Sequence, residues 1–301
     1  MSPQLLSLRR VVVLACLWFG GGRAVASITA VFEDTMAQRT RACTHCHGEA
    51  GRAGTDGYYP RLAGKPVIYL YNQLLNIRDG RRHYPLMAHL LEPLTDAYLM
   101  EFAQYFSGLN VAYPAPKPTT ASKAVMDRGF VLVTQGDSSR QIPPCQQCHG
   151  KALTGAAPHV PGLLGLPRDY LNAQLGGWRT GQRRAQSPDC MAHIASRLDA
   201  QDLIAVTHWL AAQPLPSDTK PLTELPALPA GAKEMRCGSA RLEVKAPAAK
   251  LAPLATHGAY LARIGNCETC HTAAGGKPYA GQRPIETPFG TAYSSNLTPD
   301  K

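Results

Sequence analysis

One short motif constrains this chain more than any other feature, because it occurs three times. Two cysteines separated by two residues are followed directly by a histidine, as Cys43, Cys46 and His47, as Cys145, Cys148 and His149, and as Cys267, Cys270 and His271. With the chain's content of cysteine and histidine, one such motif is expected by chance in about one chain of this length in a hundred. Three copies therefore indicate a shared chemical role.

Two chemistries use this spacing. A tetrahedral zinc site needs a second pair of Cys or His about 12 to 20 residues further on. After His47, however, the next histidine is His83 and the next cysteine is Cys145. Covalent haem attachment needs no second pair, since both sulfurs form thioethers to the porphyrin and the histidine binds the iron. The sequence predicts three haem c groups, with His47, His149 and His271 as axial ligands, and a thioredoxin-like or other metal site as the weaker alternative.

The first 26 residues predict export. They have a basic start that ends at Arg9 and Arg10, an apolar run "VVVLACLWF", and "AVA" before Ser27, which is typical of a signal peptide cleaved after Ala26. The apolar run is too short for a retained membrane span. We therefore expect a periplasmic protein, with lipidation at Cys16 as a minor alternative.

The net charge of the chain indicates which kinds of partner to expect. The chain has a net charge of +10, and removal of the signal peptide takes away three arginines and no acidic residue, which leaves +10 − 3 = +7. A basic exported protein suits acidic redox partner proteins, and peripheral association with an anionic membrane is a possibility. No nucleic-acid-binding motif is present, so no nucleic-acid partner is expected.

Two of the three motifs belong to a tandem duplication. When residues 43–106 are laid over 145–210, "CTHCHG" meets "CQQCHG", "YLYNQL" meets "YLNAQL" and "MAHLLEPL" meets "MAHIASRL", with an offset of 101 to 104 residues. Pro-rich stretches separate the copies. The predicted organisation is a signal peptide (1–26), domain 1 (27–110), a linker (111–120), domain 2 (121–213), a Pro-rich linker (214–251) and an incomplete domain 3 (252–301).

Apolar residues recur at helical spacing in both copies. In "TDAYLMEFAQYFSG", Thr95 is a candidate N-cap, Leu99, Phe102 and Phe106 share a face, and Gly108 ends the pattern. No run alternates with period two for long enough to predict a sheet. The predicted fold class is all-α, with a few short helices wrapped around each covalently bound haem.

Each copy also offers a sixth iron ligand. Met87 lies 40 residues after His47, and Met191 lies 42 after His149. We expect both on an irregular stretch after a proline, where a thioether sulfur can reach the iron. The alternatives are a core-filling methionine, or ligation by the repeat-equivalent His89 and His193.

Two cysteines remain outside the haem motifs and the signal peptide. Cys190 and Cys237 form an even pair in an oxidising compartment, which predicts a disulfide. Free thiols, or Cys190 in place of Met191 on the iron, are the alternatives. Six arginines precede the methionines, and they either form a solvated basic face or pair haem propionates and dock an acidic partner: Arg78, Arg81, Arg82, Arg179, Arg183 and Arg184.

Residues 27–213 resemble the tandem dihaem cytochromes c of the cytochrome c4 type, through "ACTHCHGEAG", "YPRLAGKPVIYLYNQLLNIRDGRR" and "PLMAHLLEPLTD". The resemblance implies tandem class I cytochrome c domains. It also implies that the backbone carbonyls of Pro60 and Pro161 accept hydrogen bonds from His47 and His149, and that the two haems lie within electron-tunnelling distance.

The last fifty residues, which include "GNCETCHTAAGGKPYAGQRPIETPFG", are similar to haem domains in cytochrome c subunits of alcohol, aldehyde and gluconate dehydrogenases. Only 30 residues follow His271, fewer than separate His from Met in the other copies. The sixth ligand of a third haem is therefore expected to be missing from this sequence, and domain 3 is predicted to be incomplete.

These observations favour a periplasmic multihaem cytochrome that relays single electrons. The donor would be a dehydrogenase or quinol oxidase, and the acceptor a terminal oxidase or small cytochrome. The alternative is a redox enzyme, such as a dihaem peroxidase or thiosulfate dehydrogenase, which would need an iron with an open position; a gas-binding haem protein is a third hypothesis. We assign no catalytic residue, and enzymatic activity by the chain alone is less expected than a role as a carrier or as the electron-transfer subunit of a dehydrogenase.

Overall fold

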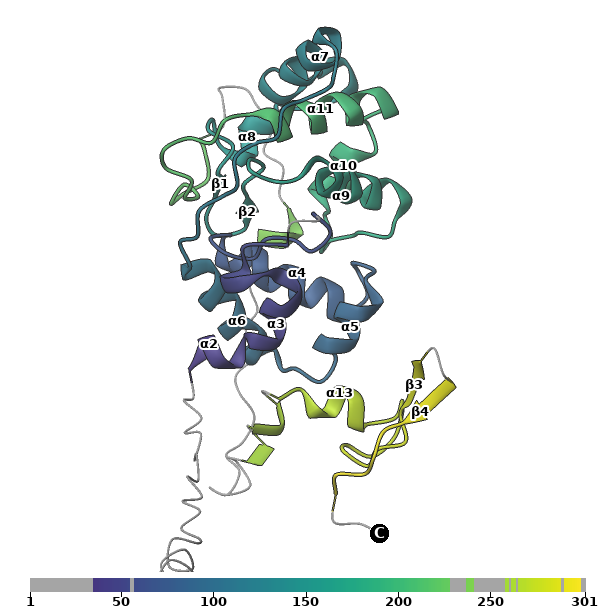
Figure 1. The fold of residues 1–301 in the computed structure, drawn as a ribbon. Coiled ribbons are helices and arrows are strands. Elements are labelled where there is room, and N and C mark those ends of the chain that lie inside the picture. Colours follow the sequence, from purple (N-terminus) through teal and green to yellow (C-terminus); the bar gives the residue numbers. More distant parts are fainter. Residues whose placement is uncertain are drawn as a thin grey trace, which may run out of the picture. The chain divides into compact units, whose positions relative to one another are not determined.

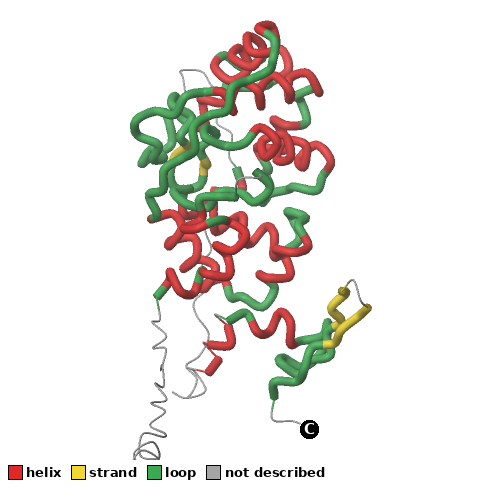
Figure 2. Tube along the Cα trace, viewed as in Figure 1, coloured by secondary structure: helices red, strands yellow, loops and turns green. Residues whose placement is uncertain are grey.

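The computed structural model describes residues 35–54, 57–227, 237–240, 258–259, 261–263, 265–287 and 290–298. The predicted signal peptide lies outside these residues, as does much of the predicted second linker. Helices and loops make up almost all of the described chain, with two short pairs of strands (Figure 2). No described helix combines the length and the apolar character needed to cross a membrane.

The first repeat is built from short helices (Figure 1). Its elements are α2 (Met36–Arg39), α3 (Arg41–His47), η2 (Glu49–Gly51), α4 (Val67–Arg78), α5 (Pro85–Leu91) and α6 (Asp96–Gly108). The side chain of Thr95 accepts a hydrogen bond from the amide of Tyr98 and so caps α6, as the sequence predicted.

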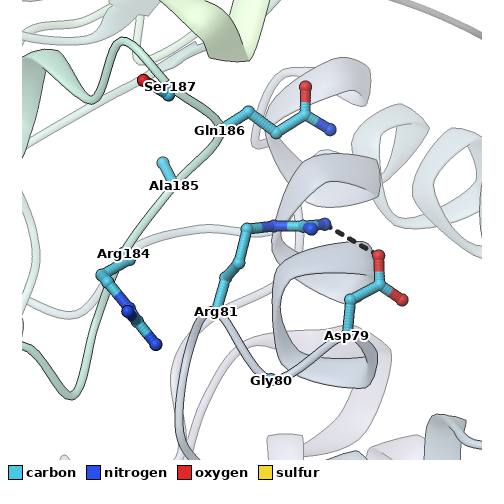
Figure 3. A pocket seen from close by; sticks show the side chains of 7 residues that line it. All are labelled: Asp79, Gly80, Arg81, Arg184, Ala185, Gln186 and Ser187. Atoms are coloured by element: carbon cyan, nitrogen blue, oxygen red, sulfur yellow. Dashed lines mark hydrogen bonds and ion pairs between the residues drawn. The ribbon is translucent and has the colours of Figure 1, made fainter.

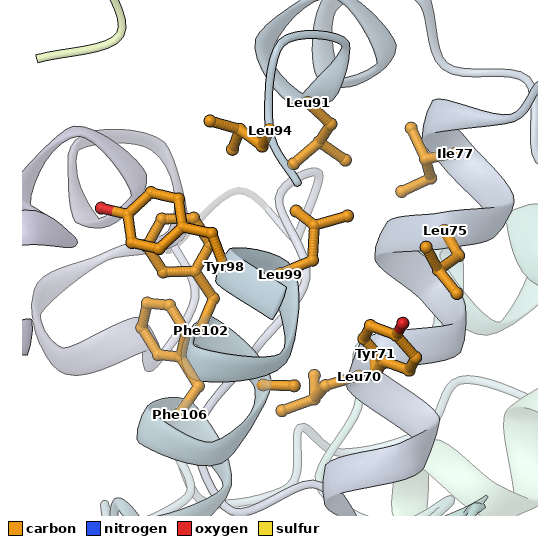
Figure 4. Packing of buried hydrophobic residues seen from close by; sticks show 11 residues of the cluster. Leu70, Tyr71, Leu75, Ile77, Leu91, Leu94, Tyr98, Leu99, Phe102 and Phe106 are labelled. Atoms are coloured by element: carbon orange, nitrogen blue, oxygen red, sulfur yellow. The ribbon is translucent and has the colours of Figure 1, made fainter. Parts of the chain in front are cut away.

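Helices α4 and α6 face each other across the apolar core of this repeat (Figure 4). Leu99 is fully buried, and Tyr98 and Phe102 stack with ring centroids 4.4 Å apart. Cys43 and Met87 both pack against this cluster. The first cysteine of the haem motif and the predicted sixth ligand therefore meet the same core.

The second repeat follows the same order. Its elements are α7 (Lys123–Thr134), η3 (Ser138–Arg140), α8 (Cys145–His149), β1 (Gly155–Ala156), β2 (Val160–Pro161), α9 (Arg168–Thr180), α10 (Cys190–Ala195) and α11 (Ala200–Ala212). Helix α11 packs against α7 and α9. A reciprocal capping box between Asp199 and Asp202 starts α11.

Backbone hydrogen bonds join the two repeats. Arg82 and Arg183 form an antiparallel β-bridge. Beside it, the His83 amide donates to the Gln182 carbonyl at 2.7 Å, and the Arg184 amide donates to the Arg81 carbonyl at 2.7 Å. We call this junction the seam.

The remaining described elements follow the second repeat in the chain. They are η4 (Gly238–Ala240), α13 (Cys267–His271) and the strands β3 (Pro284–Thr287) and β4 (Gly290–Tyr293), which pair antiparallel. The sequence predicted no strands. Every residue of β3 and β4 is exposed, so the hairpin has no buried face and leaves no alternating pattern to detect.

Candidate functional site

Each repeat places its cysteine motif in a short helix that ends at the histidine, with the first thiol against the core. Cys43 packs on the first hydrophobic cluster and Cys145 on the second. Burial raises the pKa of Cys43 to about 11 and that of Cys145 to about 12. These thiols are protonated at neutral pH, unlike the thiolates of zinc sites or of catalytic cysteines. Within the described ranges, no three His, Cys, Asp or Glu side chains gather into a metal cluster.

The histidines of the first two motifs are oriented by backbone carbonyls. His47 Nδ1 lies 2.8 Å from the Pro60 carbonyl oxygen, and His149 Nδ1 lies 2.7 Å from that of Pro161. A carbonyl oxygen only accepts, so each Nδ1 carries the proton and each Nε2 keeps a lone pair for a metal. Burial lowers the pKa of both imidazoles. This arrangement, which the cytochrome c4 resemblance implied, is confirmed.

A glycine directly after each of these histidines allows the chain to turn sharply at the end of the motif helix. Gly48 has φ of +75°, and a Cβ there would lie 2.5 Å from the carbonyl oxygen of Ala53. Gly150 repeats this backbone geometry with φ of +81°. The chain can therefore double back beneath each histidine and present the proline carbonyl to it.

The third histidine obtains its carbonyl from a different place. His271 Nδ1 lies 2.7 Å from the carbonyl oxygen of Ser295, 24 residues later in the chain. In place of glycine, Thr272 follows His271 and adopts an extended conformation. No partner for His271 was predicted from the sequence, and Ser295 lies well beyond the 12 to 13 residues that separate histidine from proline in the first two copies. The absence of glycine after His271 was the available signal.

The two predicted methionine ligands lie on helices. Met87 is in α5 and Met191 is in α10, so the expectation of an irregular stretch was wrong. Pro85 is itself the first residue of α5, where its missing amide costs nothing. The runner-up ligands lie in the same helices: His193 is exposed, and His89 Nδ1 is 3.8 Å from a carboxylate oxygen of Glu92. Ligation by Met87 and Met191 stays a prediction.

The seam contains buried cations without acidic partners. Arg183 is 6% exposed and Lys65 is 5% exposed. Arg82 and Arg183 share the same acceptors, since each donates to the side chains of Gln73 and Gln174. Among the described residues, none of these three cations has a carboxylate within ion-pair distance. We refer to Lys65, Arg82 and Arg183 as the seam cations.

The seam cations strongly affect the phenol of Tyr69, which is half-buried. Burial alone raises the pKa of Tyr69, but Arg183, Lys65 and Arg82 together lower it to about 8. Arg82 also contributes to the lowered pKa of His47, which places this positive field beside the first haem motif. Buried charge of one sign is costly unless a counter-charge is supplied. The two carboxylates of a haem c fit that need, so the residues present suit the group.

A separate hollow of about 460 Å³ lies at the outer side of the seam (Figure 3). Arg81 and Arg184 line it, one from each repeat. The guanidinium of Arg81 already donates to Asp79 at 2.8 Å and to the side-chain oxygen of Asn76 at 2.6 Å. No cysteine, histidine or methionine lines the hollow, so it is distinct from the predicted haem sites.

The two cysteines that lie outside both the motifs and the predicted signal peptide are joined. Cys190 and Cys237 form a disulfide with their Cα atoms 5.5 Å apart. Cys190 therefore has no free thiolate in this structure.

Comparison with known proteins identifies the family. No family model matches the chain. A thiosulfate dehydrogenase electron acceptor from Thiomonas intermedia is 36% identical over 218 residues, which cover 72% of this chain and 96% of the relative. The crystal structure of reduced cytochrome c4 from Pseudomonas stutzeri matches 60% of this chain and 99% of its own, with a TM-score of 0.51 and 27% identity. The chain belongs to the dihaem cytochrome c4 family.

Membership makes the chain a cytochrome c that binds haem c and carries electrons. Its tandem helical repeats are those of cytochrome c4. The C-terminal part has a different relative: 48 residues are 56% identical to the gluconate 2-dehydrogenase cytochrome c subunit from Pantoea cypripedii, which is 16% of this chain and 11% of that subunit. Cytochrome c4 similarity thus covers the repeats, and a second haem-protein similarity covers the third motif.

Proposed function

We propose that this cytochrome accepts single electrons from a thiosulfate dehydrogenase outside the cytoplasm and passes them to a further redox protein. Support for the donor comes from the Thiomonas relative, whose name is thiosulfate dehydrogenase electron acceptor and which this chain matches over nearly its full length. The predicted signal peptide supports a periplasmic location, with a mature chain beginning at Ser27.

Three haems are proposed, one for each motif. The thioether cysteines are Cys43 and Cys46, Cys145 and Cys148, and Cys267 and Cys270. Bound haem supplies the one-electron chemistry, and the protein sets its potential and its exposure to water. His47 and His149 are held by their carbonyl partners with Nε2 available to iron. Met87 and Met191 are the proposed sixth ligands, and the seam cations would hold the carboxylates.

One observation favours a carrier over an enzyme. Both repeats combine a carbonyl-oriented histidine with a methionine at an equivalent position. Two protein ligands on each iron leave no open site for substrate, whereas a peroxidase or a thiosulfate-oxidising haem needs one. We therefore expect the haems of the two repeats to be low-spin and unchanged by peroxide or carbon monoxide, while the third haem has no assigned sixth ligand and can bind either. A high-spin fraction beyond that of the third haem would favour the enzyme.

The donor is tested by direct reduction. Oxidised holoprotein is mixed with a thiosulfate dehydrogenase and thiosulfate, and haem reduction is followed by stopped-flow absorbance. We expect rapid reduction that requires both enzyme and thiosulfate. Thiosulfate without enzyme is the control, and the same slow rate in both mixtures would refute this donor.

A second donor is favoured by the C-terminal similarity. The matched relative of the third motif is a subunit of gluconate 2-dehydrogenase, which oxidises a different class of substrate. Replacing thiosulfate and its enzyme by gluconate and a gluconate 2-dehydrogenase catalytic subunit in the same assay separates the two candidates. Faster reduction by the gluconate system would make this candidate the better one.

The proposed domain boundaries are those predicted from the sequence: 27–110 and 121–213 for the two repeats and 252–301 for the third haem segment, with linkers at 111–120 and 214–251. Limited proteolysis of holoprotein should cut first within the linkers. Early cuts inside either repeat would argue against these boundaries.

A further inference from the structure

The segment 237–240 connects the methionine helix of the second repeat to the first repeat. At one end, Cys237 is bonded to Cys190, the residue directly before Met191 and the first residue of α10. At the other end, the carbonyl of Ser239 accepts a hydrogen bond from the side chain of Asn72 at 2.7 Å. Asn72 lies on α4 of the first repeat and is only 3% exposed. We call residues 237–240 with their disulfide the clamp.

The centre of the clamp is packed closely. The amide of Gly238 donates to the Pro188 carbonyl at 2.9 Å. A Cβ on Gly238 would lie 2.3 Å from the carbonyl oxygen of Ser187, so only glycine fits without movement. Ser187 and its neighbour Gln186 are among the residues drawn in Figure 3. The clamp is therefore seated on the loop that leads into α10.

Helix α10 depends on such attachments because it has only six residues, too few for a stable isolated helix. Its N-cap, Asp189, accepts from the Ala192 amide at 3.0 Å and from the Trp178 indole at 3.2 Å, which ties it to its own repeat. The clamp adds a covalent attachment at the next residue and continues it to the other repeat.

The first repeat has no equivalent. Leu86 stands before Met87 where Cys190 stands before Met191, and it is 54% exposed. Met87 packs against the first hydrophobic cluster, whereas in the described part of the chain Met191 does not pack against the second. Core packing places one methionine, and the other relies on the loop and on the clamp.

We propose that the clamp is the positioning element for Met191 and keeps its sulfur at the second haem iron, while Met87 needs no such element. This rests on the proposed assignment of Met191 as an axial ligand. The clamp takes no part in electron transfer itself. Its effect is to reduce the population of states in which the methionine has left the iron.

The test is cyanide binding to the ferric holoprotein. At the two repeat haems cyanide enters only when methionine leaves, so its rate follows the population of that open state, whereas the third haem, which has no assigned sixth ligand, gives a fast phase common to all variants. The variant is Cys190→Ser with Cys237→Ser, which removes the disulfide without leaving a thiol. We expect cyanide to bind the second haem about tenfold faster, in proportion to a larger open population. The matched control is Leu86→Ser in the first repeat, which should leave both rates unchanged.

A second variant covers the case in which the double substitution unfolds the repeat. Asn72→Ala keeps the disulfide and removes only the hydrogen bond to Ser239, and it should raise the same rate by a smaller factor. Tryptophan fluorescence gauges folding, since Trp178 and Trp209 both lie in the second repeat.

The outcomes separate the clamp from the ligand assignment. If Met191→Ala binds cyanide rapidly but the double serine variant and Asn72→Ala behave as wild type, the clamp proposal is wrong and the ligand assignment survives. If Met191→Ala itself leaves cyanide binding unchanged, Met191 is not the ligand and both fail. Faster binding in the double variant and in Met191→Ala, with Leu86→Ser unchanged, supports both.

Discussion

The two repeats orient their histidines alike but stabilise their last helices differently. Tyr98 in α6 and Asp202 in α11 occupy equivalent positions, 104 residues apart. Tyr98 stacks on Phe102 inside an aromatic core. Asp202, only 2% exposed, instead accepts from Arg140 at 2.6 Å and from Arg128 at 2.9 Å. The duplicated fold thus keeps the orientation of its two histidines. The contacts that stabilise the last helix of each repeat differ: they are aromatic in α6 and ionic in α11.

The largest effect on stability should come from breaking the ionic network of Asp202, Arg140 and Arg128. Asp202→Asn removes the buried carboxylate that accepts from Arg140 and Arg128, while both arginines keep Asp137 as a partner; losing hydrogen bonds to a charged group typically costs about 1.5–3 kcal/mol. We expect that loss in the free energy of unfolding of the second repeat, measured by hydrogen exchange with mass spectrometry, which reports on each repeat separately. The matched change in the first repeat, Tyr98→Phe, removes one hydroxyl and should cost no more than about 1.5 kcal/mol. Equal losses at the two sites would contradict the comparison.

Low pH should destabilise the second repeat more than the first, because of the same ionic network. Burial alone raises the pKa of Asp202, but Arg140 and Arg128 outweigh it and hold the pKa below its usual value. Hydrogen bonds from Ser139 and Arg140 lower the pKa of Asp137 to about 2. A depressed carboxyl pKa stabilises the fold above the unfolded pKa of about 3.9, and this contribution is lost as pH falls through the folded value.

The second repeat should therefore lose stability between about pH 4 and pH 2. Hydrogen exchange with mass spectrometry resolves the repeats, and protection in α7 and α11 should fall before protection in α4 and α6. In Asp202→Asn this difference in pH dependence should shrink. Earlier loss of protection in the first repeat would be the opposite of what the network predicts.

A smaller effect is expected at the seam. Lys65 contributes a buried cation from the first repeat, and its equivalent in the second repeat, 101 residues later, is Leu166. Lys65→Leu gives both repeats a leucine at this position and removes one positive charge from the first repeat. The reduction potential of the first haem should fall by a few tens of millivolts, as expected for the loss of one partly screened positive charge. Spectroelectrochemistry measures it, with Lys220→Leu as an exposed control; equal shifts would argue against a special role for the seam.

Exposed arginines should give the smallest effect. Arg179 and Arg184 are exposed, and both come from the second repeat, whereas Arg78 and Arg81 in the first are paired with Asp79. If the exposed pair docks an acidic partner, electron transfer from the donor should slow with rising salt. Arg179→Gln with Arg184→Gln should flatten that dependence. A rate independent of salt in wild type would leave these arginines as a solvated surface.

The sequence predicted the parts of this molecule that repeat. Helix α6 was foreseen from Thr95 and its apolar spacing, because cap and periodicity are local signals. The carbonyl partners of His47 and His149 were available through family resemblance. The carbonyl partner of His271, Ser295, could not be predicted, since this contact depends on how a later loop folds back. The seam was also missed: Lys65, Arg82 and Arg183 lie far apart in sequence, and only the pairing of the two repeats brings them together.

The measurement that tests the central claim most directly is the weak red absorption of ferric iron bound to methionine sulfur. It should be recorded for wild type, Met87→Ala and Met191→Ala at equal haem content. If each repeat of this cytochrome c4 holds its iron between histidine and methionine, each substitution should remove a comparable part of the band and lower one reduction potential by on the order of 100 mV, well within the range that axial ligands control. If neither substitution alters the band or any potential, the methionines are core residues and the carrier assignment loses its structural basis.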